Sequence, residues 1–166
     1  MANGNELHVV LGASGGLGNA VVQELAKQGK KVRAVNRSGK IDVPEGVGVI
    51  AADTSDAEST LKACQGAAVI YNCVNVLYTD WQEKLPPIYD NIIEAASSIN
   101  ARLVVGDNLY MYGYADGPIK EDLPYASLER KGKLRAQLAN TVMEAHKSGK
   151  IKVAIGRAPD YKDLMP

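Results

Sequence analysis

The glycines near the amino end most constrain what this chain can fold into. Gly12, Gly15 and Gly18 follow an apolar run at residues 7–12 and precede a helical apolar pattern that stops at Gly29. In such a turn the first glycine allows the chain to leave a strand sharply, the second lets a phosphate approach the backbone, and the third lets the helix pack closely. A glycine triplet alone also occurs in purely structural turns, but its place between strand and helix favours nucleotide binding. We therefore predict that a dinucleotide pyrophosphate binds at Gly12, Ser14, Gly15, Gly16, Leu17 and Gly18.

Apolar runs typical of strands alternate with helical patterns along the rest of the chain. We predict strands at residues 7–12, 31–36, 47–52, 67–74, 102–106 and 151–156, with helices after residue 16 and at 56–64, 88–99 and 134–145, and a loop at 112–125. Parallel strands need helical crossovers between them, so this alternation predicts a three-layer α/β/α, doubly wound parallel sheet of about six strands. No interdomain linker interrupts the pattern, and residues 1–166 are expected to form a single dinucleotide-binding domain of the Rossmann type.

The charge and cysteine content exclude several classes of protein. With 19 basic and 19 acidic residues the formal net charge is zero, which gives no reason to expect nucleic acid or an acidic membrane surface as a partner. No apolar run approaches the ~20 residues that span a bilayer, and the first residues do not resemble a signal peptide. Two cysteines, Cys64 and Cys73, suit a reducing compartment, so we expect a cytoplasmic protein. The two histidines are far apart and carboxylates do not cluster, so no metal site is predicted.

The end of the second predicted strand bears on the choice of cofactor. A carboxylate at this place would bind the ribose 2′-hydroxyl of NAD and repel a 2′-phosphate. The sequence instead has Asn36, Arg37 and Ser38, which offer a planar cation and further polar groups to a phosphate. An exposed loop arginine without a ligand is the alternative. We predict NADP, with NAD as the less favoured cofactor.

Taken together, these segments resemble the short-chain dehydrogenase/reductase superfamily, in the extended or atypical branch that includes NAD(P)-dependent epimerases and dehydratases. The resemblance is carried by residues 12–18, 51–54, 71–75, 108–113, 121–124 and 156–159 in that order. It implies that Asp53 and Thr54 contact the adenine end of the cofactor. It also implies that Cys73, Val74 and Asn75 line the cofactor. A buried, inert thiol is the simpler interpretation of Cys73, because no evident cation would lower its pKa.

The catalytic positions depart from that family pattern. The family uses a Ser or Thr, then a Tyr and a Lys four residues apart on one helix. Alignment on Gly132 places Lys131 at the Tyr position and Arg135 at the Lys position, and Asn108 takes the Ser/Thr position. Arg135 could hold a ribose, and Lys131 beside a second cation could transfer protons. Tyr110 could supply a phenol.

The resemblance implies an NADP(H)-binding protein that transfers hydride on a small carbonyl, hydroxyl or nucleotide-sugar substrate. The missing Tyr-Lys pair leaves open a non-catalytic dinucleotide-binding or redox-sensing protein. Extended members carry a C-terminal substrate domain after the sixth strand, which the sequence lacks, so an isolated cofactor-domain fragment is also open. Tyr78 and Trp81 could wall the nicotinamide side or pack under a turn at Pro86 and Pro87.

A homodimer is expected from two apolar helical stripes, at residues 88–99 and 134–145. Together they exceed what one sheet face obviously buries, and the corresponding helices of the superfamily often pair across a two-fold axis.

Overall fold

A single parallel sheet of six strands organises the protein. The computed structural model describes residues 6–159. Its elements are β1 (Leu7–Leu11), α1 (Gly16–Lys27), β2 (Lys31–Asn36), β3 (Gly48–Ala51), α2 (Ala57–Cys64), β4 (Ala67–Asn72), α3 (Trp81–Ser98), β5 (Arg102–Asp107), the short 3₁₀ helix η1 (Tyr110–Tyr112), α4 (Arg130–Lys147) and β6 (Lys152–Arg157). The strand order is β3-β2-β1-β4-β5-β6 and every pairing is parallel, which confirms the predicted fold class.

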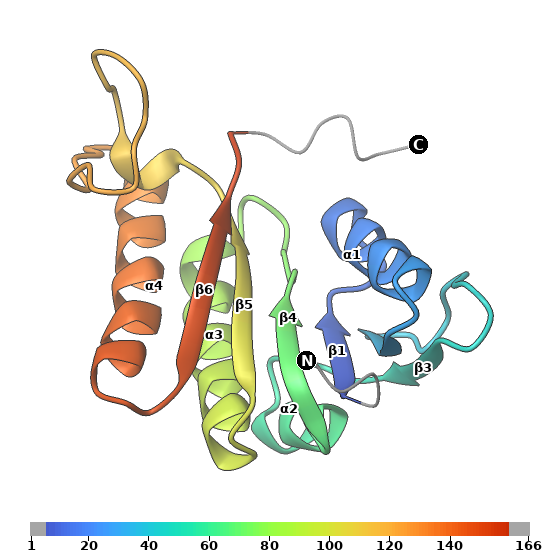
Figure 1. Cartoon of the computed structure of the whole chain (residues 1–166). Helices are drawn as coiled ribbons and strands as arrows, with labels where there is room; N and C mark the ends of the chain where they lie inside the picture. Colours follow the sequence, from blue (N-terminus) through green and yellow to red (C-terminus); the bar gives the residue numbers. More distant parts are fainter. Residues whose placement is uncertain (1–5, 160–166) are drawn as a thin grey trace.

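The strand order reverses between β1 and β4, and this reversal decides where a ligand can bind. The chain first runs outward from β1 to β2 and β3, then returns to β4 and runs outward on the other side. Helices that follow β1 and β4 therefore lie on opposite faces, and a crevice opens between them at the carboxyl ends of the strands. Figure 1 shows α1 on one face of the sheet and α3 and α4 on the other.

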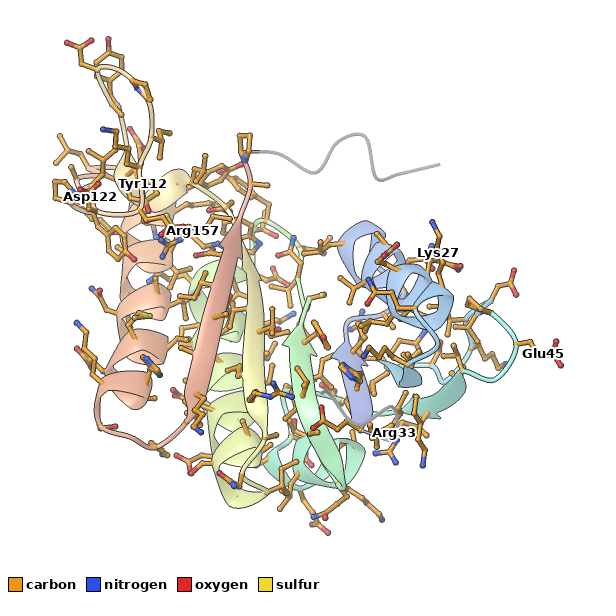
Figure 2. All side chains as sticks on the ribbon, in the orientation of Figure 1. Lys27, Arg33, Glu45, Tyr112, Asp122 and Arg157 are labelled. Carbon is orange, nitrogen blue, oxygen red and sulfur yellow. The ribbon has the colours of Figure 1, made fainter. Side chains whose placement is uncertain are left out.

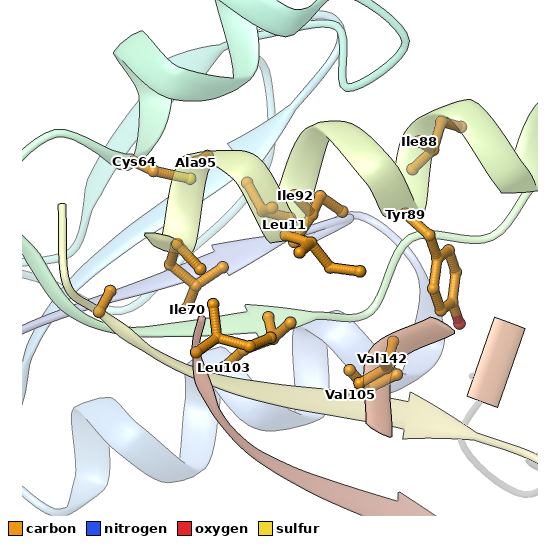
Figure 3. Packing of buried hydrophobic residues seen from close by; sticks show 14 of the residues in the cluster. Leu11, Cys64, Ile70, Ile88, Tyr89, Ile92, Ala95, Leu103, Val105 and Val142 are labelled. Atoms are coloured by element: carbon orange, nitrogen blue, oxygen red, sulfur yellow. The ribbon is translucent and has the colours of Figure 1, made fainter. Parts of the chain in front are cut away.

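Two apolar clusters form the core, one on each face of the sheet. The larger lies between the sheet and α2, α3 and α4, where Leu11, Ile70 and Leu103 meet Ile92 (Figure 3). The smaller lies under α1, around Val10 and other apolar residues of β1 and β2. The apolar residues of α3 and α4 lie within the larger cluster, so the chain itself buries both stripes. The apolar surplus on which the predicted homodimer rested is therefore not present.

Helix α3 begins seven residues earlier than the apolar pattern indicated. Pro86 and Pro87 lie inside it, so the predicted turn at these residues is wrong. Each proline removes one amide from the helical hydrogen bonds. The carbonyls left without donors belong to Gln82 and Glu83, which are exposed and accessible to water. The first turn is fixed by Trp81, whose indole Nε1 donates to the Val76 carbonyl over 3.1 Å.

The segment from η1 to α4 is tied to the end of β6 by one arginine. Arg157 donates from Nη1 to the Tyr112 hydroxyl over 2.9 Å and from Nη2 to the Tyr125 hydroxyl over 2.6 Å. Figure 2 shows Tyr112 and Arg157 close together at this end of the sheet. Tyr112 is buried, in keeping with a structural position.

In the described part of the chain no helix is both long and apolar enough to cross a membrane. The expectations about the first five residues and about residues 160–166 lie outside the described residues.

Candidate functional site

The glycine turn lies between the end of β1 and the amino end of α1. Gly12 has a φ of +78°, and the amides of Gly12 and Ala13 donate to the Val35 carbonyl over 3.1 and 3.0 Å. Gly18 lies so close to the Gly12 carbonyl that a Cβ would overlap it. No side chain caps the helix and no acidic residue stands in its first turn. Its free amides and positive dipole end therefore remain available to an anion.

One half of the site is a pocket of about 590 Å³ at the carboxyl ends of β1 to β4, here called the β2 pocket. It brings together most of the predicted cofactor residues: Gly12, Ser14, Gly15, Asn36, Arg37, Asp53, Thr54, Cys73, Val74 and Asn75. These residues come from the turns after four different strands. The strand reversal places them along one edge of the sheet.

The turn after β2 presents Arg37 to this pocket. The Asn36 side chain holds the turn, since its Nδ2 donates to the Lys40 carbonyl over 3.0 Å and its Oδ1 accepts from the Gly39 amide over 2.7 Å. Arg37 is exposed and lines the pocket. Ser38 does not line it, and its hydroxyl donates to the Lys40 carbonyl over 3.3 Å.

The turn after β3 holds Asp53 at the rim. Its Oδ1 accepts from the amide and the hydroxyl of Ser55, over 2.9 and 2.7 Å. These hydrogen bonds lower the pKa of the Asp53 carboxyl, so it is ionised at neutral pH. Thr54 is buried and its carbonyl accepts from the Asn91 side chain over 3.0 Å.

The other half of the site is a pocket of about 380 Å³ between the ends of β4 and β5 and helix α4, here called the β5 pocket. It shares four residues with the β2 pocket: Gly15, Cys73, Val74 and Asn75. It also contains Gly16 and Leu17 of the glycine turn, with Trp81, Asn108, Tyr110 and Arg135. The two pockets therefore meet at the amino end of α1, as the two nucleotides of a dinucleotide meet at the pyrophosphate.

The sequence comparison agrees with this arrangement. The profile of the NAD(P)H-binding family matches residues 12–144, most of the chain. The chain belongs to this family. It is therefore an NAD(P)-binding domain, as the glycine turn predicted. No curated protein matches the chain in sequence.

Solved structures share the fold of this NAD(P)-binding domain. UDP-glucose 4-epimerase from Thermus thermophilus, in complex with NAD, is 17% identical, with a TM-score of 0.79 over 91% of this chain and 54% of that one. UDP-N-acetylglucosamine 4-epimerase from Methanobrevibacter ruminantium is 19% identical, with a TM-score of 0.78 over 92% and 54%. Uronate dehydrogenase from Agrobacterium tumefaciens is 18% identical, with a TM-score of 0.77 over 90% and 59%. The domain thus spans little more than half the length of these chains.

Three of the four predicted catalytic residues line the β5 pocket of this domain. Asn108 and Tyr110 follow β5, and the Asn108 Oδ1 accepts from the Tyr110 amide over 3.1 Å, which leaves the Asn108 amide nitrogen free of this turn. Tyr110 is 37% exposed. Arg135 reaches the pocket from the second turn of α4. Lys131 does not line it.

Lys131 lies against the aromatic side chains of Tyr78 and Trp81, for which the sequence allowed two interpretations. Its Nζ is 3.0 Å from the centre of the Tyr78 ring and 5.0 Å from that of Trp81. This Nζ is buried and has no hydrogen-bond partner. Burial and the neighbouring Arg130 and Arg135 guanidinium groups lower the pKa of the Lys131 amine. Trp81 lines the β5 pocket, whereas Tyr78 does not.

Cys73 lies where both pockets meet, but its thiol is not activated. Burial raises its pKa to about 12, so the thiolate needed for nucleophilic or redox chemistry is scarce at neutral pH. Among residues 6–159 no group of histidine, cysteine and acidic side chains could hold a metal ion.

Proposed function

We propose that this domain binds NADP(H) across both pockets and supports hydride transfer to or from a carbonyl or alcohol of a small substrate. The observation that carries the proposal is the meeting of the two pockets at the glycine turn, because a pyrophosphate held there extends one nucleotide into each. Two of the structural neighbours are named as 4-epimerases of UDP-sugars and another as a uronate dehydrogenase. Sugar or sugar-nucleotide substrates are therefore the first to test.

Arg37 supports NADP over NAD. It is exposed at the end of β2, lines the β2 pocket, and no acidic residue occupies the turn from Asn36 to Lys40. A guanidinium group here would pair with the 2′-phosphate. Titration of NADPH and NADH, followed by nucleotide fluorescence, should show tighter binding of NADPH. Arg37→Ala should weaken NADPH binding about tenfold and leave NADH nearly unchanged.

The matched control for this substitution is Lys27→Ala, which removes an exposed cation at the far end of α1. It should change neither affinity. Tighter binding of NADH by the unaltered protein would overturn the NADP assignment, and binding of neither nucleotide would overturn the proposed function.

Asn108 and Tyr110 are the residues we assign to the reacting group. Bound NADP(H) supplies or accepts the hydride. The side-chain amide nitrogen of Asn108 would donate a hydrogen bond to the substrate oxygen. The Tyr110 phenol would exchange a proton with that oxygen. NADPH oxidation with a panel of sugar and carbonyl compounds tests this assignment. Tyr110→Phe should lower kcat at least tenfold with little effect on NADPH affinity, and Tyr114→Phe, on the exposed loop, should not.

A second candidate is a non-catalytic NADP(H)-binding or sensing protein. It is favoured by Lys131 and Arg135, which stand where the superfamily pattern has a tyrosine and a lysine. NADPH binding without turnover on any compound of the panel would support it.

The predicted homodimer and cytoplasmic location remain proposals. The outer faces of α3 and α4 carry polar and charged residues, so a dimer through them would be polar. Light scattering after gel filtration tests the oligomeric state, and a monomer would reject the dimer. Cys64 and Cys73 are both free thiols, which supports a reducing compartment.

A further inference from the structure

The β5 pocket contains a buried cation that the protein does not satisfy. The Arg135 side chain is only 6% exposed. Its Nη1 has two polar neighbours, an Asp107 carboxylate oxygen and the Tyr89 hydroxyl, both at 3.5 Å, which is long for a hydrogen bond. Its Nε is buried without any hydrogen-bond partner. Leaving a charged donor unpaired in the interior is costly, so a ligand atom in the pocket that Arg135 lines would relieve that cost.

Positive charge is in excess around this guanidinium group. The Asp107 carboxylate is shared, because Arg157 Nε also lies 3.5 Å from it. Lys131 adds an ammonium group one helical turn before Arg135. The first turn of α4 contains no acidic residue, and the N-cap residue Glu129 that precedes it makes no capping hydrogen bond with its side chain. Two guanidinium groups thus share one carboxylate, and the Lys131 ammonium group lies on the same helix as one of them.

We propose that the pair Arg135 and Lys131 binds an oxyanion of the substrate, either a carboxylate or a phosphoryl group. The inference rests on the proposed function, in which the β5 pocket takes the nicotinamide end of the cofactor. That end carries no anion, and the pyrophosphate lies at the glycine turn. The anion that would pair with Arg135 and Lys131 therefore belongs to the substrate and not to the cofactor. Guanidinium groups bind carboxylates and phosphates with charge-assisted hydrogen bonds.

The aromatic side chains of Tyr78 and Trp81 lie against the Lys131 amine. Tyr78 is 55% exposed and lies on the loop between β4 and α3, with its ring against the Lys131 amine. The Trp81 ring lies next to both cations, with the Lys131 Nζ 5.0 Å and the Arg135 Cζ 4.0 Å from its centre. A cation–π contact at the surface is weaker than a charge-assisted hydrogen bond. An oxyanion therefore displaces the Tyr78 ring and bridges Lys131 and Arg135 beside Trp81.

Trp81 is the single tryptophan of the chain and reports on this site directly. The experiment follows its fluorescence in NADP⁺-saturated protein at constant ionic strength, with sodium acetate, inorganic phosphate or acetamide as the added probe. Acetate or phosphate should give a saturable change, and whichever binds more tightly identifies the carboxylate or phosphoryl source. Acetamide, which has nearly the shape of acetate but no charge, should give none.

Variants separate the site from general charge effects. Lys131→Met should weaken the response to the anion about tenfold. Lys133→Met, on an exposed position of the same helix, should leave it unchanged. Arg135→Lys keeps the charge but loses the fork of donors and should weaken the response as well. Lys131→Met decides the question if the buried Arg135 variant does not fold.

The proposal is overturned if acetate and acetamide act alike, or if Lys131→Met and Lys133→Met respond alike. NADPH titrations of the same variants distinguish failure of the anion site from failure of the proposed function. The NADPH affinity of Lys131→Met should lie within about twofold of that of the unaltered protein. If no variant binds NADPH but the anion response persists in cofactor-free protein, the proposed function fails and the anion site stands.

Discussion

Two glycines of the same turn serve different purposes at the residue scale. A Cβ on Gly18 would overlap the Gly12 carbonyl, so the packing of α1 against the turn requires glycine there. A Cβ on Gly15 would meet only the Gly12 oxygen, at 3.5 Å, which is ordinary van der Waals contact. Gly15 has an extended backbone, with φ −78° and ψ 160°, that any residue can adopt. The fold therefore does not require glycine at position 15, although that residue lines both pockets.

Alanine at these two positions should separate folding from binding. Gly18→Ala should lower the free energy of unfolding by about 1–3 kcal/mol, because α1 must shift away from the turn. Gly15→Ala should leave stability within about 0.5 kcal/mol but weaken NADPH binding at least tenfold, because the added methyl group lies where the pyrophosphate approaches the backbone. Urea denaturation and NADPH titration measure the two effects. Equal loss of stability in both variants would contradict this division of roles.

At the scale of elements, α2 depends on a cap at its amino end. The Asp56 carboxylate accepts a hydrogen bond from the Ser59 amide over 2.7 Å. The helix has only eight residues, so it has little intrinsic stability and is held by this cap and by its packing on α3.

Removal of this cap should therefore be measurable. Asp56→Ala should destabilise the protein by about 1 kcal/mol in urea denaturation. Asp56→Asn, which can still accept the hydrogen bond, should cost much less. If the two variants unfold at the same urea concentration, the carboxylate does not stabilise the helix by capping.

The elements also show what the sequence could and could not predict. All six strands were predictable because each is an apolar run followed by a turn. Most of the residues predicted to bind the cofactor line one pocket because they follow those strands. The start of α3 was not, because two adjacent prolines normally end a helix, and here the unpaired carbonyls are exposed to water. The approach of Tyr78 to Lys131 joins residues 53 positions apart, and no local pattern indicates such a contact.

At the scale of the whole molecule, His8 makes stability depend on pH. It is 7% exposed in β1, its Nδ1 lies 3.1 Å from the Tyr71 hydroxyl, and Lys30, Glu6 and Arg102 surround it. Burial, together with Lys30 and Arg102, lowers the pKa of this imidazole below the ordinary 6.5, while Glu6 acts in the opposite direction. The unfolded chain therefore takes up a proton at a higher pH than the folded protein does.

The free energy of unfolding should accordingly decrease as the pH falls from 7 through the ordinary histidine pKa of 6.5 toward the lower folded value. His8→Gln should flatten this decrease, whereas His146→Gln, at an exposed position near the end of α4, should retain it. Thermal unfolding between pH 5 and pH 8 provides the comparison. An identical slope in the His8 variant would show that other groups cause the dependence.

The residues assigned to the proposed reaction lie at the carboxyl edge of the sheet. This placement affects how such a domain can diversify. Tyr78, Asn108 and Tyr110 do not belong to the two apolar clusters that hold the sheet to its helices, whereas Val76 and Met111 on the same segments are packed inside. Mutations at the exposed positions of these segments can therefore accumulate without an equal cost in folding. Lineages that inherit this sheet can exchange one reactant for another while the cofactor turn stays fixed. A laboratory library confined to the exposed residues 77–79 and 116–122 would search new chemistry on a scaffold that continues to fold.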